Sequence, residues 1–188
     1  MPRRTSPRVQ LAIVTTALAV AVGACGSSGG SGDASAGESA AVSATSATAL
    51  EQQAGRLRGG VVDAFKAQLA ALKGTPVVVN QWASWCGPCR FEFPFFRSQA
   101  TKLSGTVAFL GVDSQDSTGD AREFLKANSV PYPSFEDQDG QIARVFRGGR
   151  AFPTTAFYDA GGDLTKTHVG AYATEAKLAQ DIREYATR

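Results

Sequence analysis

The chain has 188 residues, a formal net charge of +2 at pH 7 and a hydrophobic content of 43%. This length is enough for one domain with its own core, and a charge so near balance excludes the broad basic surface typical of nucleic-acid-binding proteins. The small excess of positive charge comes from the N-terminal segment. Without Arg3, Arg4 and Arg8 the chain has 16 basic and 17 acidic residues. We therefore expect no nucleic acid among its partners.

The first 24 residues predict an export signal. Their three arginines form a positive segment, and the apolar run that follows at residues 11–22 is too short to cross a bilayer as a helix. The run ends in Val22-Gly23-Ala24-Cys25, which resembles the lipobox of bacterial lipoproteins. The resemblance implies cleavage after residue 24, lipidation of Cys25 and attachment to the extracytoplasmic face of the membrane. Two alternatives stay open: an ordinary secretory signal ending near residue 24, and twin-arginine export, although the apolar residues usual after such a pair are absent.

A flexible tether is predicted next. In residues 26–49, 21 of 24 residues are Gly, Ser, Ala or Thr, and no apolar period could bury a core. Residues 50–58 are polar and fit either an extension of the tether or a first helix. The predicted organisation is therefore a lipoprotein signal peptide at 1–24, the lipidated cysteine and tether at 25–58, and one folded domain at 59–188.

Helices and strands alternate along the predicted domain. Apolar spacing predicts a helix at residues 61–72, and a run of β-branched residues predicts a buried strand at 77–82. The following elements are a helix at 88–103 with Pro94 inside it, a strand at 107–112, a helix at 121–128, a strand at 134–136 and a helix at 141–146. A hairpin at 154–158 and 164–169 and a helix at 174–185, capped by Thr174, complete the chain. This order describes a three-layer α/β domain around a mixed sheet.

Two cysteines stand where the strand at 77–82 leads into the next helix, in the run Trp85-Cys86-Gly87-Pro88-Cys89. Thiols three positions apart at a helix start form a reversible two-electron switch, because the unpaired N–H groups there favour the reactive thiolate. A structural disulfide is the weaker interpretation, since so short a loop gains little stability from closure. A zinc site needs two more nitrogen or sulfur ligands, and the chain offers only His168 and Cys25, which is expected to carry a lipid. We expect a redox pair with no metal and no other cofactor.

Four segments agree in order and spacing with a known pattern: residues 77–89, Glu92-Phe93-Pro94, Phe152-Pro153-Thr154, and the turn at 159–162 followed by Val169-Gly170. Together they resemble the thioredoxin superfamily, and within it the extracytoplasmic TlpA/ResA-like thiol-disulfide oxidoreductases. The resemblance covers roughly residues 61–188. It implies a thioredoxin fold, an α/β/α sandwich with a helix-strand segment inserted before the strand that follows a cis-proline.

The resemblance also implies roles for the cysteine run. Cys86 is expected to be the exposed nucleophile, and Cys89, one turn deeper, the resolving thiol that breaks the mixed disulfide. Trp85, Gly87 and Pro88 are expected to contact the substrate.

A cis peptide bond between Phe152 and Pro153 is the second implied feature. It would lie beside the cysteines, expose the Phe152 backbone to a substrate strand and keep metals away from the thiols. The alternative is an ordinary trans proline before a strand.

Glu92 is the third implied site residue. It follows Cys89 by three positions on the same helix face, where an apolar surround would raise its pKa and let it shuttle a proton to or from that thiol. The apolar surround is expected from Phe91, Phe93, Phe95 and Phe96. Thioredoxins proper carry a buried Asp where this chain has Asn80, so the acid has moved to Glu92. A solvated surface glutamate is the alternative.

Three arginines, Arg144, Arg147 and Arg150, precede Phe152-Pro153. They could rim the site and select acidic partners, or form an ordinary solvated face.

The function expected from these features is a membrane-anchored, extracytoplasmic protein thiol-disulfide oxidoreductase. Its partners would be thiols or disulfides of exported proteins and a membrane redox partner that resets the pair. Gly87-Pro88 and Glu92 favour a reductase, for example of apocytochrome c. The alternatives are a thiol oxidant that installs disulfides, a peroxiredoxin-like enzyme, whose Pro-x-x-x-Thr-x-x-Cys setting is absent, and a non-enzymatic lipoprotein binding module.

Overall fold

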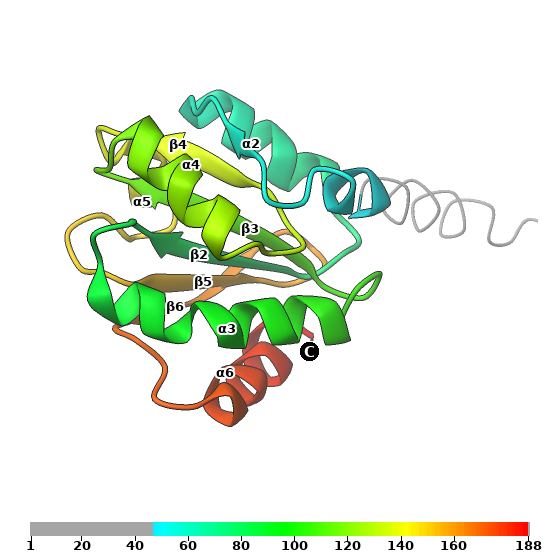
Figure 1. Ribbon diagram of the computed structural model, residues 1–188. Coiled ribbons are helices and arrows are strands. Elements are labelled where there is room, and N and C mark those ends of the chain that lie inside the picture. The colour runs from blue at the N-terminus through cyan, green and yellow to red at the C-terminus, as the bar shows by residue number, and fades with distance from the viewer. Residues whose placement is uncertain (1–46, 188) are drawn as a thin grey trace, which may run out of the picture. The chain divides into compact units, whose positions relative to one another are not determined.

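Six strands form the central sheet, in the order β1-β4-β3-β2-β5-β6 (Figure 1). The computed structural model describes residues 47–187, so the predicted signal peptide and Cys25 lie outside the described residues. The strands are β1 (Leu57–Arg58), β2 (Val77–Trp82), β3 (Ala108–Ser114), β4 (Ser134–Asp137), β5 (Thr154–Tyr158) and β6 (Leu164–Val169). Neighbours from β1 to β2 are parallel, whereas β5 is antiparallel to both β2 and β6.

Helices cover both faces of this sheet. They are α2 (Val62–Ala71), α3 (Gly87–Lys102), α4 (Thr118–Ala127), α5 (Gln141–Val145) and α6 (Glu175–Asp181), which continues as the π-helical segment η1 (Ile182–Ala186). Side chains of β2 alternate between the faces: Val78 and Trp82 pack with α3, α4 and α6, and Val77 and Val79 pack with α2 and α5. The predicted three-layer α/β sandwich with a mixed sheet is confirmed. The segment β4-α5 precedes the loop that leads to β5.

The prediction that the tether extends to residue 58 is wrong for its last part, and the alternative of a first helix is confirmed in part, since residues 47–51 are helical. Leu50 is only 2% exposed and belongs to the core on the α2 face, and β1 pairs in parallel with β4 through Leu57↔Ser134 and Arg58↔Phe135. Residues 47–58 therefore pack on the domain. A two-residue edge strand and a single buried leucine make no period that a sequence pattern can reveal.

The carboxyl end of β2 positions the cysteine run. Trp82, the last residue of β2, is fully buried, and its Nε1 donates a hydrogen bond to Ser134 Oγ at 3.2 Å. Gly111 makes this contact possible, because a Cβ there would lie 2.1 Å from Ser134 Oγ and 2.9 Å from Trp82 Nε1. The chain then turns into α3 over four residues, so that the motif lies where the sheet meets the helix N-terminus.

Candidate active site at the start of α3

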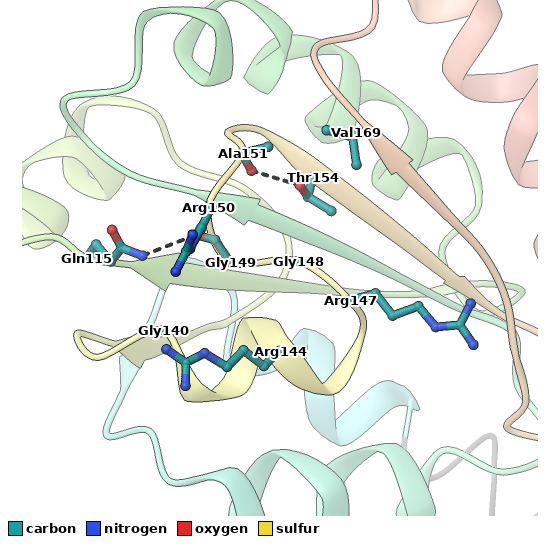
Figure 2. Close-up of a pocket in the computed structure, with 10 residues that line it drawn as sticks. All are labelled: Gln115, Gly140, Arg144, Arg147, Gly148, Gly149, Arg150, Ala151, Thr154 and Val169. Atoms are coloured by element: carbon teal, nitrogen blue, oxygen red, sulfur yellow. Dashed lines mark hydrogen bonds between the residues drawn. The ribbon is translucent and has the colours of Figure 1, made fainter.

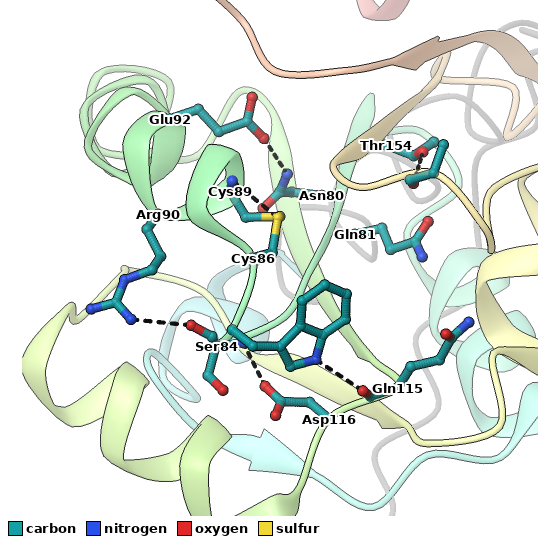
Figure 3. Close-up of a disulfide and its surroundings, with 12 residues drawn as sticks. Asn80, Gln81, Ser84, Cys86, Cys89, Arg90, Glu92, Gln115, Asp116 and Thr154 are labelled. Carbon is teal, nitrogen blue, oxygen red and sulfur yellow. Dashed lines mark hydrogen bonds between the residues drawn. A yellow bond between two sulfur atoms is a disulfide. The ribbon is translucent and has the colours of Figure 1, made fainter.

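Cys86 and Cys89 are joined by a disulfide at the first turn of α3, with Cα atoms 5.3 Å apart (Figure 3). Cys86 is the N-cap of the helix, and its Sγ accepts a hydrogen bond from the Cys89 N–H at 3.1 Å. The same N–H and the positive end of the helix would stabilise a thiolate on Cys86 once the disulfide is reduced. The predicted pairing of the two cysteines is confirmed.

The expected exposure of Cys86 is wrong for the disulfide form. Cys86 is 3% exposed and Cys89 is 1% exposed, because both belong to the core cluster under α3. The residues around Cys86 are open instead: Trp85 is 56% exposed, Gly87 and Pro88 are exposed, and a Cβ on Gly87 would meet nothing within 4 Å. A partner chain can therefore approach the backbone beside Cys86 without a side chain in its way.

The peptide bond between Phe152 and Pro153 is cis, as predicted. The half-buried Phe152 ring packs against Trp85, with the ring centroids 5.0 Å apart. The Pro153 carbonyl accepts the Gly170 N–H at 2.9 Å. Within residues 47–187, the Phe152 N–H and C=O make no backbone hydrogen bond, which leaves them available to an added strand.

Glu92 is fully buried, so the alternative of a surface glutamate is wrong. Its Oε1 accepts a hydrogen bond from Asn80 Nδ2 at 3.1 Å, and its Oε2 accepts one from the Tyr172 N–H at 2.9 Å. Burial raises the pKa of Glu92 to about 7, and these two hydrogen bonds oppose the rise. Of the four nearby phenylalanines that predicted an apolar surround, Phe91 points into solvent.

Asn80 suits a partner that changes protonation state. It is 1% exposed, and its Oδ1 has no hydrogen-bond partner among the described residues. An amide can act as a donor through its N–H or as an acceptor through its C=O. Rotation of the Asn80 amide would therefore let its oxygen accept a hydrogen bond from the protonated Glu92 carboxyl group. The neutral amide thereby supports both forms of the acid.

Sequence reasoning missed the loop after β3, which holds the cysteine run in place. Gln115 accepts the Trp85 Nε1–H at its backbone oxygen, 3.0 Å away, and the Asp116 carboxylate accepts the Ser84 N–H. The signal was available, because β2 and β3 are adjacent parallel strands whose carboxyl ends lie at the same edge. Polar residues directly after the second buried strand were therefore candidates.

Asp113 is a second buried acid near this edge. It is 2% exposed and lies opposite Trp82 in the sheet register. Burial, followed by the neighbouring charges of Asp116, Glu136 and Asp137, raises the pKa of Asp113 to about 8.

In residues 47–187, no group of three or more His, Cys, Asp or Glu side chains is arranged to hold a metal ion. Over the same residues, none of the helices combines the length and apolar character needed to cross a membrane.

Helices on both faces of a mixed sheet, with a cysteine pair at the carboxyl end of a central strand, make this domain a thioredoxin fold. The chain belongs to the AhpC/TSA family, whose profile matches residues 48–167.

Similar proteins come from several bacteria. The chain is 36% identical over 99 residues to the Thiol:disulfide interchange protein DsbE homolog of Paracoccus denitrificans, covering 52% of each chain. It is 30% identical over 106 residues to the Thiol-disulfide oxidoreductase ResA of Bacillus subtilis, covering 56% of this chain and 59% of ResA. The solved structure of the pneumococcal exposed lipoprotein thioredoxin Etrx1 from Streptococcus pneumoniae superposes with a TM-score of 0.54 at 29% identity, covering 62% of this chain and 89% of that one. The chain thus spans about half the length of the curated relatives it matches.

Proposed function

We propose that the protein is a thiol-disulfide oxidoreductase that exchanges disulfides with other proteins through Cys86 and Cys89. The observation that carries the proposal is the disulfide at the N-terminus of α3, with the open Gly87 backbone on one side and the cis Phe152-Pro153 bond nearby. The names of the relatives, a disulfide interchange protein and a disulfide oxidoreductase, support it.

The reaction begins from the reduced pair. The Cys86 thiolate attacks one sulfur of a substrate disulfide, whose S–S bond breaks as the mixed disulfide forms, and the released substrate thiolate takes a proton. The Cys89 thiolate then attacks Cys86 Sγ. This restores the Cys86–Cys89 disulfide and releases the second substrate sulfur as a thiol, so that two electrons pass from the pair to the substrate.

Glu92 serves the second step. It follows Cys89 by one turn of α3, and with a pKa of about 7 its carboxylate is available near neutral pH to take the proton that Cys89 must lose. Its burial keeps the exchanged proton out of bulk water.

The proposed setting is the extracytoplasmic face of the membrane, with a lipid on Cys25 as the anchor. The lipobox-like run before Cys25 supports this, as does the structural similarity to a protein described as an exposed lipoprotein. In the reducing direction, the substrates are disulfides of exported proteins such as apocytochrome c. A membrane-bound dithiol partner then resets the Cys86–Cys89 disulfide.

Replacement of Cys89 by serine tests the function directly. Because the resolving thiol is gone, mixed disulfides should accumulate on Cys86 in cells and appear as high-mass bands that vanish on reduction. The bands should be absent when Cys86 is also replaced by serine, which is the matched control. If the Cys89→Ser protein accumulates no reducible adducts, protein disulfide exchange is the wrong function.

The reduction potential decides the direction of electron flow. For a reductase we expect a value near that of thioredoxin, about −270 mV, whereas an oxidant would lie near about −120 mV. Equilibration of the Cys86–Cys89 pair with a glutathione or dithiothreitol series measures it. A value at the oxidising end would replace the reductase assignment with that of a disulfide donor.

A further inference from the structure

A pocket of about 770 Å³ opens beside the candidate active site, between the loop after β3 and the loop after α5 (Figure 2). The residues that matter for its chemistry are Gln115, Arg144, Arg147, Gly149, Arg150 and Thr154. It is lined on one side by Ala151 and Thr154, the residues that flank the cis Phe152-Pro153 bond.

The pocket is positively charged. Arg144, Arg147 and Arg150 are all exposed, and none of them forms an ion pair with any residue from 47 to 187. Figure 2 shows the Arg144 and Arg150 guanidinium groups on the same side as Gln115, with Arg147 extending in the opposite direction. Two cations on the same side of a concave surface, with Arg147 as a third cation among its lining residues, attract an anionic ligand.

Two acids shortly before this loop in the sequence, Asp137 and Asp139, pair with backbone N–H groups and form no ion pair with these arginines. Asp137 accepts hydrogen bonds from the Ile142 and Ala143 N–H groups at 2.8 and 2.9 Å. Asp139 accepts the Gln141 N–H at 3.3 Å.

The backbone of the pocket is held in an uncommon conformation. Among the described residues, Gln115 and Arg147 are the non-glycine residues with positive φ, at 55° and 63°, and both line the pocket. Such conformations disfavour a side chain like Arg and concentrate at functional sites. The fully buried Gln81 fixes the loop, since its Oε1 accepts the Gly149 N–H at 3.0 Å and its Nε2 donates to the Gly149 oxygen at 3.4 Å.

Gln115 connects the pocket to the cysteine run. Its backbone oxygen accepts the Trp85 Nε1–H at 3.0 Å, and its Nε2 donates to the Gly149 oxygen at 3.1 Å. One residue thus touches both the tryptophan before Cys86 and the arginine-bearing loop. A chain that occupies the pocket lies next to the surface from which Cys86 is reached.

We propose that this pocket binds an acidic segment of the protein whose cysteines exchange with Cys86. The inference rests on the proposed function and adds the chemistry of the partner: Asp or Glu side chains near its reacting cysteine. Exposed ion pairs are individually weak and act mainly on the association rate, so the preference is expected to be roughly threefold to tenfold and to fall with salt.

Two disulfide-bonded peptides test the inference. They are identical except that one carries glutamates and the other glutamines beside the cysteines. We expect the reduced wild-type protein to exchange faster with the glutamate peptide at low salt and equally with both at high salt. The variant Arg144→Gln/Arg150→Gln should lose the preference while its rate with the glutamine peptide is unchanged. Arg183→Gln, an exposed arginine after α6, is the matched control and should keep the preference.

Arg147→Asn is the second variant, because asparagine tolerates the left-handed conformation and should not unfold the loop. It is expected to reduce the preference. Equal low-salt rates of wild type with both peptides would overturn the inference while leaving the proposed function standing. No exchange with either peptide would overturn both. If the arginine variants instead lose only their binding to phosphatidylglycerol vesicles, with no peptide preference in wild type, the pocket belongs to the membrane surface and the inference is wrong.

Discussion

Replacing Cys86 with serine is expected to slow protein disulfide exchange by on the order of a thousandfold or more, because a hydroxyl does not ionise here and cannot attack a disulfide sulfur. The remaining thiol cannot substitute for it. Cys89 is the third residue of α3 and is 1% exposed, whereas Cys86 is the N-cap and is flanked by the exposed Trp85 and Gly87. The reduction of insulin disulfides measures the loss.

The fold should survive this change, so the lower exchange rate would result from the missing thiol and not from unfolding. A serine oxygen at position 86 can accept the Cys89 N–H that Sγ accepts now, and serine is a favoured N-cap residue. The matched control is Cys86→Ser/Cys89→Ser, which should unfold at the same urea concentration as Cys86→Ser. Exchange at the wild-type rate by Cys86→Ser would mean that Cys86 is not the attacking residue.

Replacing Glu92 with glutamine is expected to remove a large pH-dependent part of the free energy of unfolding. Burial raises the pKa of Glu92 from 4.5 to about 7 in the folded protein. As the pH rises from 4.5 to 7, the unfolded chain releases this proton while the folded chain keeps it, so the wild type loses stability across that window. The shift corresponds to about 3 kcal/mol at roughly 1.4 kcal/mol per pH unit, a loss that glutamine does not suffer.

Urea unfolding of the oxidised proteins between pH 4 and 8 measures this difference. The stability of Glu92→Gln relative to wild type should increase as the pH rises through the window and level off above it. Asp113, with a pKa of about 8, also makes the free energy of unfolding fall as the pH rises, and it does so equally in wild type and Glu92→Gln. The difference in stability between the two proteins therefore isolates Glu92. Replacement of the exposed Glu123 by glutamine is the control. Parallel pH profiles for Glu92→Gln and wild type would show that the acid is not held neutral by burial.

The same substitution has a kinetic consequence. If Glu92 moves the Cys89 proton, the pH profile of exchange should lose its inflection near pH 7 in Glu92→Gln. A purely structural role would change stability and leave that inflection in place.

Short sequence patterns were sufficient to predict the features that form between residues close together in the chain. The strands at 77–82, 154–158 and 164–169 were predicted with the observed bounds, because runs of β-branched residues next to Gly and Pro form strands in most contexts. Thr174 was predicted as a cap, and its side chain accepts the Lys177 N–H at 3.3 Å. The cysteine pair belongs to this group, since its bond closes between residues three apart.

Long-range contacts explain what the sequence pattern missed. The packing of residues 47–58 depends on a parallel pairing with β4, more than seventy residues further along the chain. The loop after β3 became part of the site because of hydrogen bonds to Ser84 and Trp85, across 32 and 30 residues. Neither contact has a periodic signal, because each joins two segments that lie far apart in the sequence and meet only in the folded chain.

By itself, the sequence determined an alternating order of helices and strands and a dithiol at a helix start, because spacing and composition along neighbouring residues decide both. The likeness to thioredoxins came from a resemblance of four separate segments to a known family. Only the tertiary structure decided the environment of that dithiol. Cys86 is buried in the disulfide form, and Glu92 accepts a hydrogen bond from Tyr172, 80 residues away, inside the core. Desolvation sets the pKa of Glu92, and desolvation depends on every segment packed around the carboxyl group. No local pattern carries that information.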